Sequence, residues 1–340
     1  DLVEEIARVH GYDAIPVTIP VGEIPNPRLD PFQGLKRCIH EVMHRHGLYE
    51  ACHVAWYATD EFQKLRPENH DPVRDQIAVE NPLSREMAVL RTSLLPSLLQ
   101  SVAYNRRHQV EHIALYELQR VFIPGPLGEL PDEQLTLAGA IAGASAKHWS
   151  TDDAGPDLYD VKGIVEALLE EVGIADGSLE RSDSGTLHPG RSATLSVGGE
   201  EVGFLGEVHP DVLQNYGLTH RVYVFSVNVA RLAAHGDPTR WMDQLPPFPN
   251  TTRDLAIVVD EGVPAENVLN AIRQSVSGLL AAITLFDVYT GEHVAEGKKS
   301  LAFALEYRSH ERTLTDTEVD KLQAQILHSL EEELGAVLRS

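Results

Sequence analysis

Three short runs of alternating apolar and polar residues lie within residues 188–229, and they favour a sheet over any other local structure. The first run ends at Gly198 and Gly199, a pair that tolerates the positive φ angles of a tight hairpin turn. The second run resumes at Val202, and the third covers residues 222–229. Because an isolated hairpin is only marginally stable in water, we predict at least three antiparallel strands in one sheet.

Helices and strands surround this predicted sheet. The spacing of apolar residues predicts helices at 31–46, 93–108, 157–171 and 210–217. Alternating patterns predict strands at 48–58, 111–124 and 135–144. This irregular succession of helices and strands indicates the α+β class.

The end of the chain has the pattern of a separate small domain. A proline-rich break at 236–250 precedes it. The patterns that follow have the order strand, helix, strand, strand, helix, strand, which is the ferredoxin-like βαββαβ arrangement. Thr315 and Glu318 have the spacing of a capping box at the start of the last helix.

The chain is strongly acidic, with 51 Asp and Glu against 28 Lys and Arg and a net charge of -23. Such a charge repels a phosphate backbone, so any contact with nucleic acid must be local or assisted by a partner. No run approaches the roughly 18–20 apolar residues that a membrane span needs. Cys38 and Cys52 provide neither a disulfide framework nor a four-ligand zinc site. We therefore expect a cytoplasmic protein.

The first helix, residues 1–12, carries three carboxylates on one face. Asp1, Glu4 and Glu5 share that face through spacings of three and four residues. Two interpretations remain open: a site for a hard divalent cation, or a solvated face with acids near the favourable end of the helix dipole. Because the helical pattern is already under way at Asp1, we expect the chain to be a piece of a longer protein.

Residues 40–44, HEVMH, match the zinc-protease pattern H-E-x-x-H, in which two histidines bind the metal and the glutamate acts as a base. On a helical wheel, His40 and His44 lie on the flank of the apolar arc, towards solvent. That arc consists of Phe32, Leu35, Ile39, Val42 and Met43. Because a catalytic metal pair should face an enclosed cleft, we expect no stoichiometric zinc here.

Four stretches, in order along the chain, carry a family resemblance. They are DLVEEIARVHGYDAIP; NPLSREMAVLRTSLLPSLL with LYELQRVF; LHPGRSA with GFLGEVHPDVLQNYGL; and FPNTTRDLAIVVD with GKKSLAFALEYRSHERTLTDTEV. Together they resemble the C-terminal half of the β subunit of bacterial phenylalanyl-tRNA synthetase. The resemblance implies three parts: the end of a helical DNA-binding-like domain with a proline-rich linker (1–30), a class II synthetase-like antiparallel sheet domain with helices (31–240), and a ferredoxin-fold anticodon-binding domain (247–340).

The resemblance also implies a function and partners. In that family the β core is non-catalytic, the α subunit uses ATP, and the enzyme contains two α and two β chains that act on tRNA(Phe). The chain lacks the G-x-G-x-G-x-x-R segment with which class II synthetases position ATP, so we expect no catalytic residues and no activity from this chain alone. The family motif D-L-V-E-E implies a Mg²⁺ site on Asp1, Glu4 and Glu5, completed by an acid upstream.

Basic residues in or beside the strands of the last domain are candidates for RNA contact. They are Arg253, Lys298, Lys299, Arg308 and Arg312. A four-stranded sheet with one helix-covered face leaves the other face open, and such a surface suits single-stranded RNA. The alternative is that these cations pair with the neighbouring acids Asp254, Glu306 and Glu311.

Three classes of function therefore remain: a non-catalytic synthetase subunit, a stand-alone RNA-binding or scaffold protein that reuses these folds, and a zinc metalloprotease carried by HEVMH. Zinc stoichiometry would distinguish the protease. A stable complex with a synthetase α subunit would distinguish the first class from the second.

Overall fold

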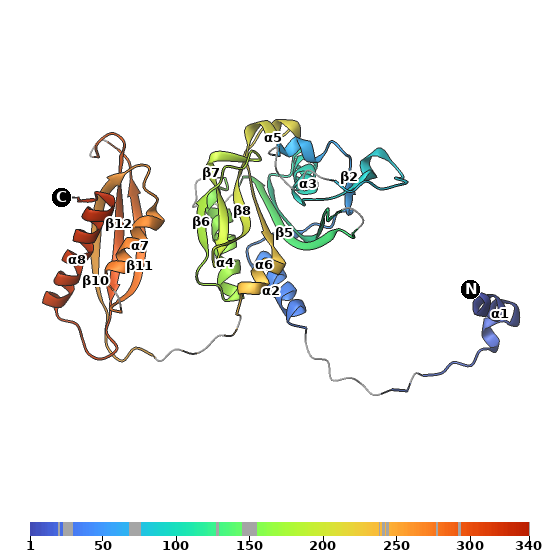
Figure 1. Cartoon of the computed structure of the whole chain (residues 1–340), viewed down its shortest axis with the longest axis horizontal. Coiled ribbons are helices and arrows are strands. Elements are labelled where there is room, and N and C mark those ends of the chain that lie inside the picture. Colours follow the sequence, from blue (N-terminus) through green and yellow to red (C-terminus); the bar gives the residue numbers. More distant parts are fainter. Residues whose placement is uncertain are drawn as a thin grey trace. The chain divides into compact units, whose positions relative to one another are not determined.

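The chain forms two compact units, Asp1–Arg240 and Trp241–Ser340 (Figure 1). The structure is a computed structural model, and it describes residues 1–19, 21–22, 30–67, 76–126, 129–144, 155–237, 239, 242, 245–276, 278–291 and 294–339. Within these ranges, no helix is both long enough and apolar enough to cross a membrane.

The first unit is organised around a seven-stranded sheet with the order β1-β4-β5-β9-β8-β7-β6. Its strands are β1 (Tyr49–Glu50), β4 (His112–Ile123), β5 (Asp132–Gly143), β6 (Ser178–Arg181), β7 (Leu187–Val197), β8 (Glu200–Val208) and β9 (Val222–Asn228). From β4 to β6 each described pair is antiparallel, as predicted, whereas β1 runs parallel to β4. The short parallel strand makes the whole sheet mixed rather than purely antiparallel.

The predicted three-stranded core of this sheet is confirmed. β7 and β8 form a hairpin in which Val197 lies opposite Glu200, and β9 pairs with the other edge of β8. Gly198 and Gly199 make the turn at φ angles of 57° and 80°. Side chains with a Cβ rarely adopt these angles, so the Gly-Gly pair fixes the register of the hairpin.

The prediction of one strand at 48–58 is wrong. The segment contributes β1 to the large sheet and β2 (Trp56–Tyr57) to a separate two-stranded sheet with β3 (Val89–Leu90). Between them, the backbone N–H of His53 donates to a side-chain oxygen of Glu117 at 3.2 Å. Because this donor binds a side chain, the segment leaves the large sheet at that point.

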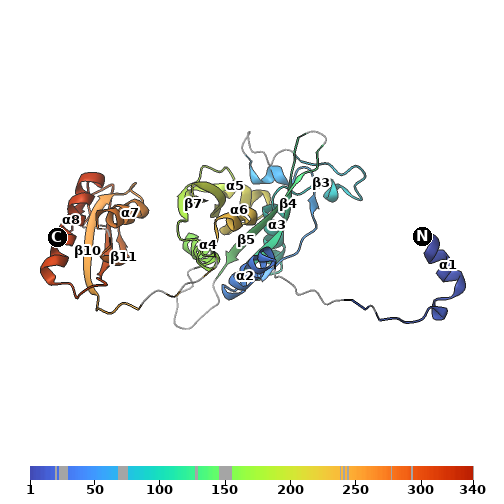
Figure 2. The ribbon, with the colours of Figure 1, turned by 60° about the horizontal axis from the view of Figure 1, so that its bottom comes forward.

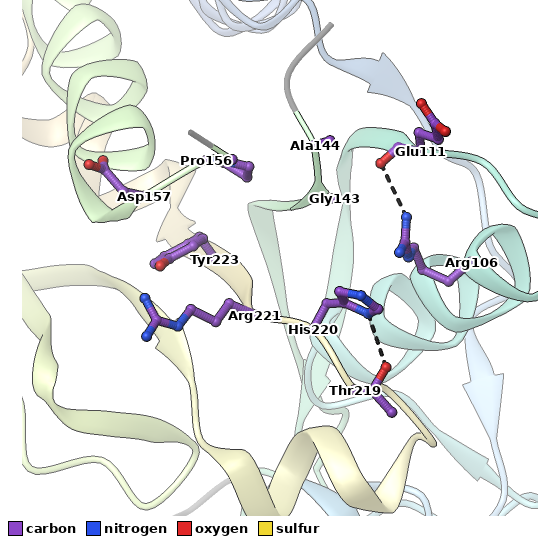
Figure 3. Close-up of a pocket in the computed structure, with 11 residues that line it drawn as sticks. Arg106, Glu111, Gly143, Ala144, Pro156, Asp157, Thr219, His220, Arg221 and Tyr223 are labelled. Carbon is purple, nitrogen blue, oxygen red and sulfur yellow. Dashed lines mark hydrogen bonds between the residues drawn. The ribbon is translucent and has the colours of Figure 1, made fainter. Parts of the chain in front are cut away.

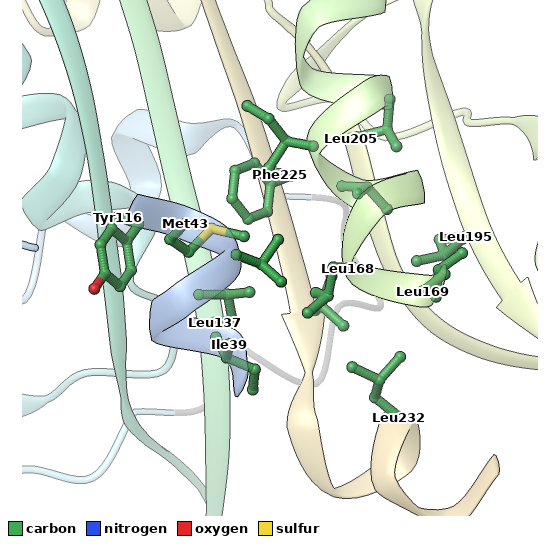
Figure 4. Packing of buried hydrophobic residues seen from close by; sticks show 14 of the residues in the cluster. Ile39, Met43, Tyr116, Leu137, Leu168, Leu169, Leu195, Leu205, Phe225 and Leu232 are labelled. Atoms are coloured by element: carbon green, nitrogen blue, oxygen red, sulfur yellow. The ribbon is translucent and has the colours of Figure 1, made fainter. Parts of the chain in front are cut away.

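Helices cover both faces of the large sheet (Figure 2). One face packs against α2 (Pro31–Arg45), α4 (Leu158–Val172) and α6 (Val229–His235), and the other against α3 (Leu95–Arg107) and α5 (Pro210–Asn215). Figure 4 shows the first core, where Met43 from α2 and Leu168 from α4 pack near Phe225 from β9. Because both faces are covered, the first four residues of β9 are apolar on both sides and buried, and polar residues enter only at Ser226 and Asn228.

The remaining described elements of this unit are short. They are α1 (Leu2–His10), η1 (Tyr12–Ala14), η2 (Phe62–Leu65) and η4 (Arg85–Met87). The helix predicted for residues 1–12 is thus present as α1, and it has no buried residue.

The second unit has the predicted ferredoxin-like order. Its elements are β10 (Thr251–Asp260), α7 (Ala265–Ser275), β11 (Leu280–Tyr289), β12 (Lys298–Tyr307), α8 (Asp316–Leu334) and β13 (Val337–Leu338). The strands form an antiparallel sheet in the order β11-β12-β10-β13. The capping box predicted for Thr315 and Glu318 is present at the start of α8.

We expect Tyr307→Phe to stabilise the second unit. The Tyr307 hydroxyl is buried with no hydrogen-bond partner among the described residues, and burial raises the pKa of Tyr307 to about 12. A buried hydroxyl without a partner costs about 1–3 kcal/mol, so its removal should raise the free energy of unfolding by about 1 kcal/mol. In calorimetry of the whole chain this corresponds to a midpoint about 4–8 °C higher for a domain of this size.

Tyr57→Phe is the matched control for that experiment. The Tyr57 hydroxyl accepts from the backbone N–H of Thr92 at 2.9 Å and lies 3.0 Å from the Thr92 hydroxyl. Its removal should destabilise the first unit. A Tyr307→Phe midpoint that falls as far as that of Tyr57→Phe would show that the Tyr307 hydroxyl is satisfied after all.

Candidate nucleic-acid interface

The sheet of the second unit has one face covered by helices and one face that helices leave open. Leu255, Ile257 and Phe303 point into the core shared with α7 and α8. The residues between them in sequence point to the other side. We call this side the open face. Its uncharged members include Ala256, Val258, Tyr289, Ser300, Ala302, Ala304 and Val337, and its charged members include Asp254, Asp260, Asp287, Lys298, Glu306 and Arg339.

An aromatic ring and a cation lie together on the open face. The Arg339 guanidinium carbon is 5.0 Å from the centroid of the Tyr289 ring. Its Nη1 donates to the Ser300 hydroxyl at 3.1 Å, and Ser300 is the cross-strand neighbour of Tyr289. The backbone N–H of Arg339 donates to the carbonyl of Ala256 at 2.9 Å. These contacts hold a flat cation against a flat ring.

Such an arrangement can bind an unpaired base. Aromatic rings and guanidinium planes are the groups on which proteins stack single-stranded bases. The nearby strand positions Ala256, Ala302 and Ala304 carry only methyl side chains, of which that of Ala302 is buried. The sequence prediction missed Tyr289 and Arg339, because Arg339 reaches the sheet only through the two-residue strand β13.

Two of the predicted RNA-binding residues lie on the helix-covered side. Arg253 is directly opposite Leu305, and its guanidinium binds Asp316 of α8 at 2.6 Å and lies 4.0 Å from Asp320. Lys299 is opposite the buried Val259 and is half-buried itself. Their positions in the register therefore separate them from the open face.

The other three predicted residues are paired with acids. Lys298 lies 2.9 Å from Asp260, Arg308 lies 2.6 Å from Glu306, and Arg312 binds Glu318 with two bonds of 2.6 and 2.8 Å. The pair of Arg308 with Glu306 agrees with the alternative predicted from the sequence. For Arg253 and Arg312 the partners are acids of α8 instead of the sequence neighbours Asp254 and Glu311. Thus the structure does not bring the five predicted residues together on one face.

Glu318 links Arg312 to the start of α8. Its carboxylate accepts from Arg312 and from the N–H and hydroxyl of Thr315, and the pKa of Glu318 is lowered to about 2. Since the folded pKa is below the unfolded value, this stabilising contribution is complete above the ordinary pKa of about 4.5 and is lost as the pH falls towards 2. At neutral pH, Arg312 therefore faces an ionised Glu318 carboxylate, to which it donates two hydrogen bonds.

The three carboxylates predicted to bind Mg²⁺ do not converge. Asp1 precedes α1, and Glu5 accepts hydrogen bonds from Arg8 at 2.6 and 3.0 Å. Among the described residues, no group of three or more His, Cys, Asp or Glu side chains is arranged to hold a metal ion. The described residues therefore do not supply a complete set of ligands for Mg²⁺ by themselves.

The HEVMH motif lies on α2, with Ile39, Val42 and Met43 buried as predicted. The histidines are not simply solvated: His40 Nδ1 and His44 Nε2 lie 2.8 and 3.0 Å from the same Tyr116 hydroxyl. Burial, with the charge of Glu50, raises the pKa of Tyr116 to about 12, so the phenol is protonated at neutral pH. It can donate to one imidazole and accept from the other.

A cavity of about 790 Å³ lies near the ends of β5 and β9 (Figure 3). Arg106 lines it but donates to the carbonyl oxygens of Val110 and Glu111 at 3.0 and 3.2 Å, just beyond the end of α3. Arg221 lies 3.8 Å from Glu207, and Asp157 caps α4. Because these charged side chains are already bound to other groups of the protein, we assign no substrate to the cavity.

Two family models match the chain. Residues 15–229 match a model described as "Phenylalanyl tRNA synthetase beta chain CLM domain", which is more than half of the 340 residues. Residues 246–339 match a model described as "Ferredoxin-fold anticodon binding domain".

Curated relatives match the whole chain. The phenylalanine–tRNA ligase beta subunit of Moorella thermoacetica is 41% identical over 341 residues, covering 100% of this chain and 42% of the relative. Those of Symbiobacterium thermophilum and Geobacillus kaustophilus are 40% and 38% identical, again over 100% of this chain and over 38% and 42% of the relative. The chain thus spans about two fifths of the length of these relatives. Among solved structures, a pyrrolysyl tRNA synthetase of Desulfitobacterium hafniense has a TM-score of 0.46 at 15% identity over 59% of this chain and 64% of that one, a likeness too distant to support an argument.

Proposed function

The chain belongs to the family of phenylalanyl-tRNA synthetase β chains, and on this basis we propose that it is a non-catalytic part of the β subunit that binds tRNA(Phe) through its ferredoxin-fold unit. The open face carries this proposal. It presents Tyr289 and Arg339 side by side, and that chemistry suits the unpaired bases of an anticodon loop. The overall acidity of the chain restricts RNA contact to such a local surface.

The same proposal assigns ATP use and amino-acid activation to a partner subunit. An α subunit supplies the site that uses ATP and activates phenylalanine, and the β chain structures the complex, which contains two α and two β chains in the cytoplasm. The sequence of this chain supports an ATP site on the α subunit, because the chain itself contains no G-x-G-x-G-x-x-R segment. The three relatives described above are β subunits of the ligase, so they support neither a stand-alone scaffold nor a zinc protease.

Two measurements on the purified chain test this function. We expect the chain alone to give no phenylalanine-dependent exchange of pyrophosphate into ATP, because it lacks a segment to position ATP. When co-expressed with the α subunit of the same enzyme, it should elute with that subunit as one complex. An unrelated class II synthetase subunit serves as the control and should elute apart.

Either of two results would exclude the proposed role. Exchange activity in the chain free of α subunit would mean that it carries its own active site. Separate elution from the α subunit, by a chain that is folded by circular dichroism, would favour the stand-alone RNA-binding protein instead.

We also propose that Asp1, Glu4 and Glu5 bind Mg²⁺ weakly, with a further acid from sequence upstream. Carboxylate oxygens are the ligands that Mg²⁺ prefers, but binding requires that the pair of Glu5 with Arg8 opens. In the protein with its upstream sequence, Glu4→Ala with Glu5→Ala should weaken Mg²⁺ binding in calorimetric titration. Glu331→Ala with Glu332→Ala removes the same charge from α8 and should leave it unchanged. Equal titrations of the two double variants would refute the site.

A further inference from the structure

Ser101 of α3, His53 and Glu117 of β4 form a chain of hydrogen bonds that the proposed function does not use. The Ser101 hydroxyl oxygen lies 2.7 Å from His53 Nε2, and His53 Nδ1 lies 2.6 Å from a carboxylate oxygen of Glu117. A hydroxyl, an imidazole and a carboxylate joined in this order are the arrangement with which enzymes activate a serine. We propose that Ser101 is a nucleophile that accepts the acyl group of small carboxylic esters, with His53 as its general base.

The hydrogen bonds determine which nitrogen of the imidazole carries the proton. Glu117 forms an ion pair with Arg91, whose Nη1 lies 2.8 Å from its other oxygen, and an ionised carboxylate can only accept hydrogen bonds. A neutral His53 therefore carries its proton on Nδ1 and donates it to Glu117. Its Nε2 then directs a lone pair at the Ser101 hydroxyl, which is the orientation that a general base requires.

The burial of the three side chains agrees with these roles. Glu117 is fully buried and also accepts from the backbone N–H of His53 at 3.2 Å, so its carboxylate is fixed in place. The His53 side chain is 22% exposed and Ser101 is half-buried, so a small molecule can reach them from solvent. A serine hydroxyl inside a helix often bonds to the carbonyl four residues earlier. The hydrogen bond that the structure describes for the Ser101 hydroxyl is to His53 instead.

The acyl transfer has two stages. As Ser101 Oγ forms a bond to the carbonyl carbon of the ester, its proton passes to His53 Nε2. The bond between that carbon and the leaving alcohol or phenol then breaks, and the leaving oxygen takes the proton, which leaves an acyl-serine. Water attacks the acyl-serine in the same way, and the products are a carboxylic acid and free Ser101. Glu117 touches no reacting atom and is a positioning residue.

Ester hydrolysis by the whole chain tests this proposal, with p-nitrophenyl acetate as the probe. We expect a burst of about one nitrophenolate per chain, followed by slower turnover. Ser101→Ala and His53→Gln should each abolish the burst and lower the rate by about 100-fold or more. Ser329→Ala is the matched control and should react as the wild type does. Ser329 of α8 is also half-buried and hydrogen-bonded, but directly to Glu333 at 2.8 Å, with no imidazole between them.

Two further variants separate Ser101 from other sources of reactivity. Cys52 is exposed next to His53 in the sequence, and its thiol can attack the same ester, so Cys52→Ser should keep the burst. The amide introduced by Glu117→Gln can donate to His53 Nδ1 and hold the imidazole in the other tautomer. This variant should lose the burst at temperatures where circular dichroism shows that it is folded.

The unmutated chain provides a test that does not depend on the folding of variants. A fluorophosphonate probe should label Ser101, as located by mass spectrometry, and p-nitrophenyl acetate should slow that labelling. The proposal is overturned if the probe labels other serines equally, if the burst survives in Ser101→Ala, or if Cys52→Ser abolishes it. A folded Glu117→Gln variant that reacts as fast as the wild type would show that the three residues only connect α3 to the sheet, and would also overturn it.

Discussion

Replacing Glu117 by alanine is expected to lower the free energy of unfolding by about 3–5 kcal/mol, because the change leaves a buried arginine without its partner. Glu117 is fully buried, and one of its oxygens lies 2.8 Å from Nη1 of Arg91, whose side chain is 3% exposed. The other oxygen lies 2.6 Å from Nδ1 of His53, and His53 in turn contacts Ser101 of α3 at 2.7 Å. Chemical denaturation followed by circular dichroism measures the loss.

Glu133→Ala is the matched control for this prediction. Glu133 lies 2.7 Å from Arg120 on the same pair of strands, but the two side chains are 46% and 62% exposed. Exposed ion pairs contribute at most about 1 kcal/mol, so this variant should remain close to the wild type. If Glu117→Ala costs no more than Glu133→Ala, the buried pair contributes to neither the stability nor the connection between α3 and the sheet.

Glu117 also explains why the strand prediction for residues 48–58 failed. Local patterns predicted the β7–β8 hairpin, β9 and the order of the second unit, because a Gly-Gly turn and alternating residues act over a few positions. The apolar pattern at 48–58 also predicts a strand. The chain leaves the sheet there because His53 binds Glu117, which lies 64 positions further along the chain. No local pattern contains that partner.

Part of the candidate RNA-binding site could be predicted from the sequence. Alternation along β10 places Arg253 on the side of Leu255 and Ile257, so its position towards the helices could have been predicted once those two were recognised as core residues. The contact of Arg339 with Tyr289 could not. It depends on the antiparallel return of β13 beside β10, which brings the end of the chain across the sheet. The same limit applied to Tyr116, which joins the α2 histidines from β4.

In the assembled synthetase, Tyr289→Ala is expected to raise the KM for tRNA(Phe) by about 5- to 150-fold. This range corresponds to the loss of one stacked base, about 1–3 kcal/mol. The ring is held on the open face by its neighbours, since the Arg339 guanidinium lies over it and Ser300 lies beside it. Aminoacylation at several salt concentrations measures the effect. KM for phenylalanine and ATP should not change, because the substitution is confined to the second unit.

Arg339→Ala separates stacking from charge on the same surface. If Arg339 neutralises a phosphate of the loop, its removal should raise the KM for tRNA and reduce the slope of log KM against log salt by about 0.7. Tyr289→Ala should leave that slope unchanged, because the ring carries no charge. Two variants with the same slope would mean that Arg339 acts only by holding the ring.

The double variant Arg308→Ala with Arg312→Ala is the matched control that tests whether tRNA binds the open face or the segment after β12. Both arginines were candidates by sequence, but Glu306 and Glu318 hold them at 2.6 Å. A carboxylate already neutralises much of the charge of each arginine, so the double variant should change KM less than Tyr289→Ala alone. A large increase from the double arginine variant, with a wild-type KM in Tyr289→Ala, would move the RNA surface from the open face to the segment between β12 and α8.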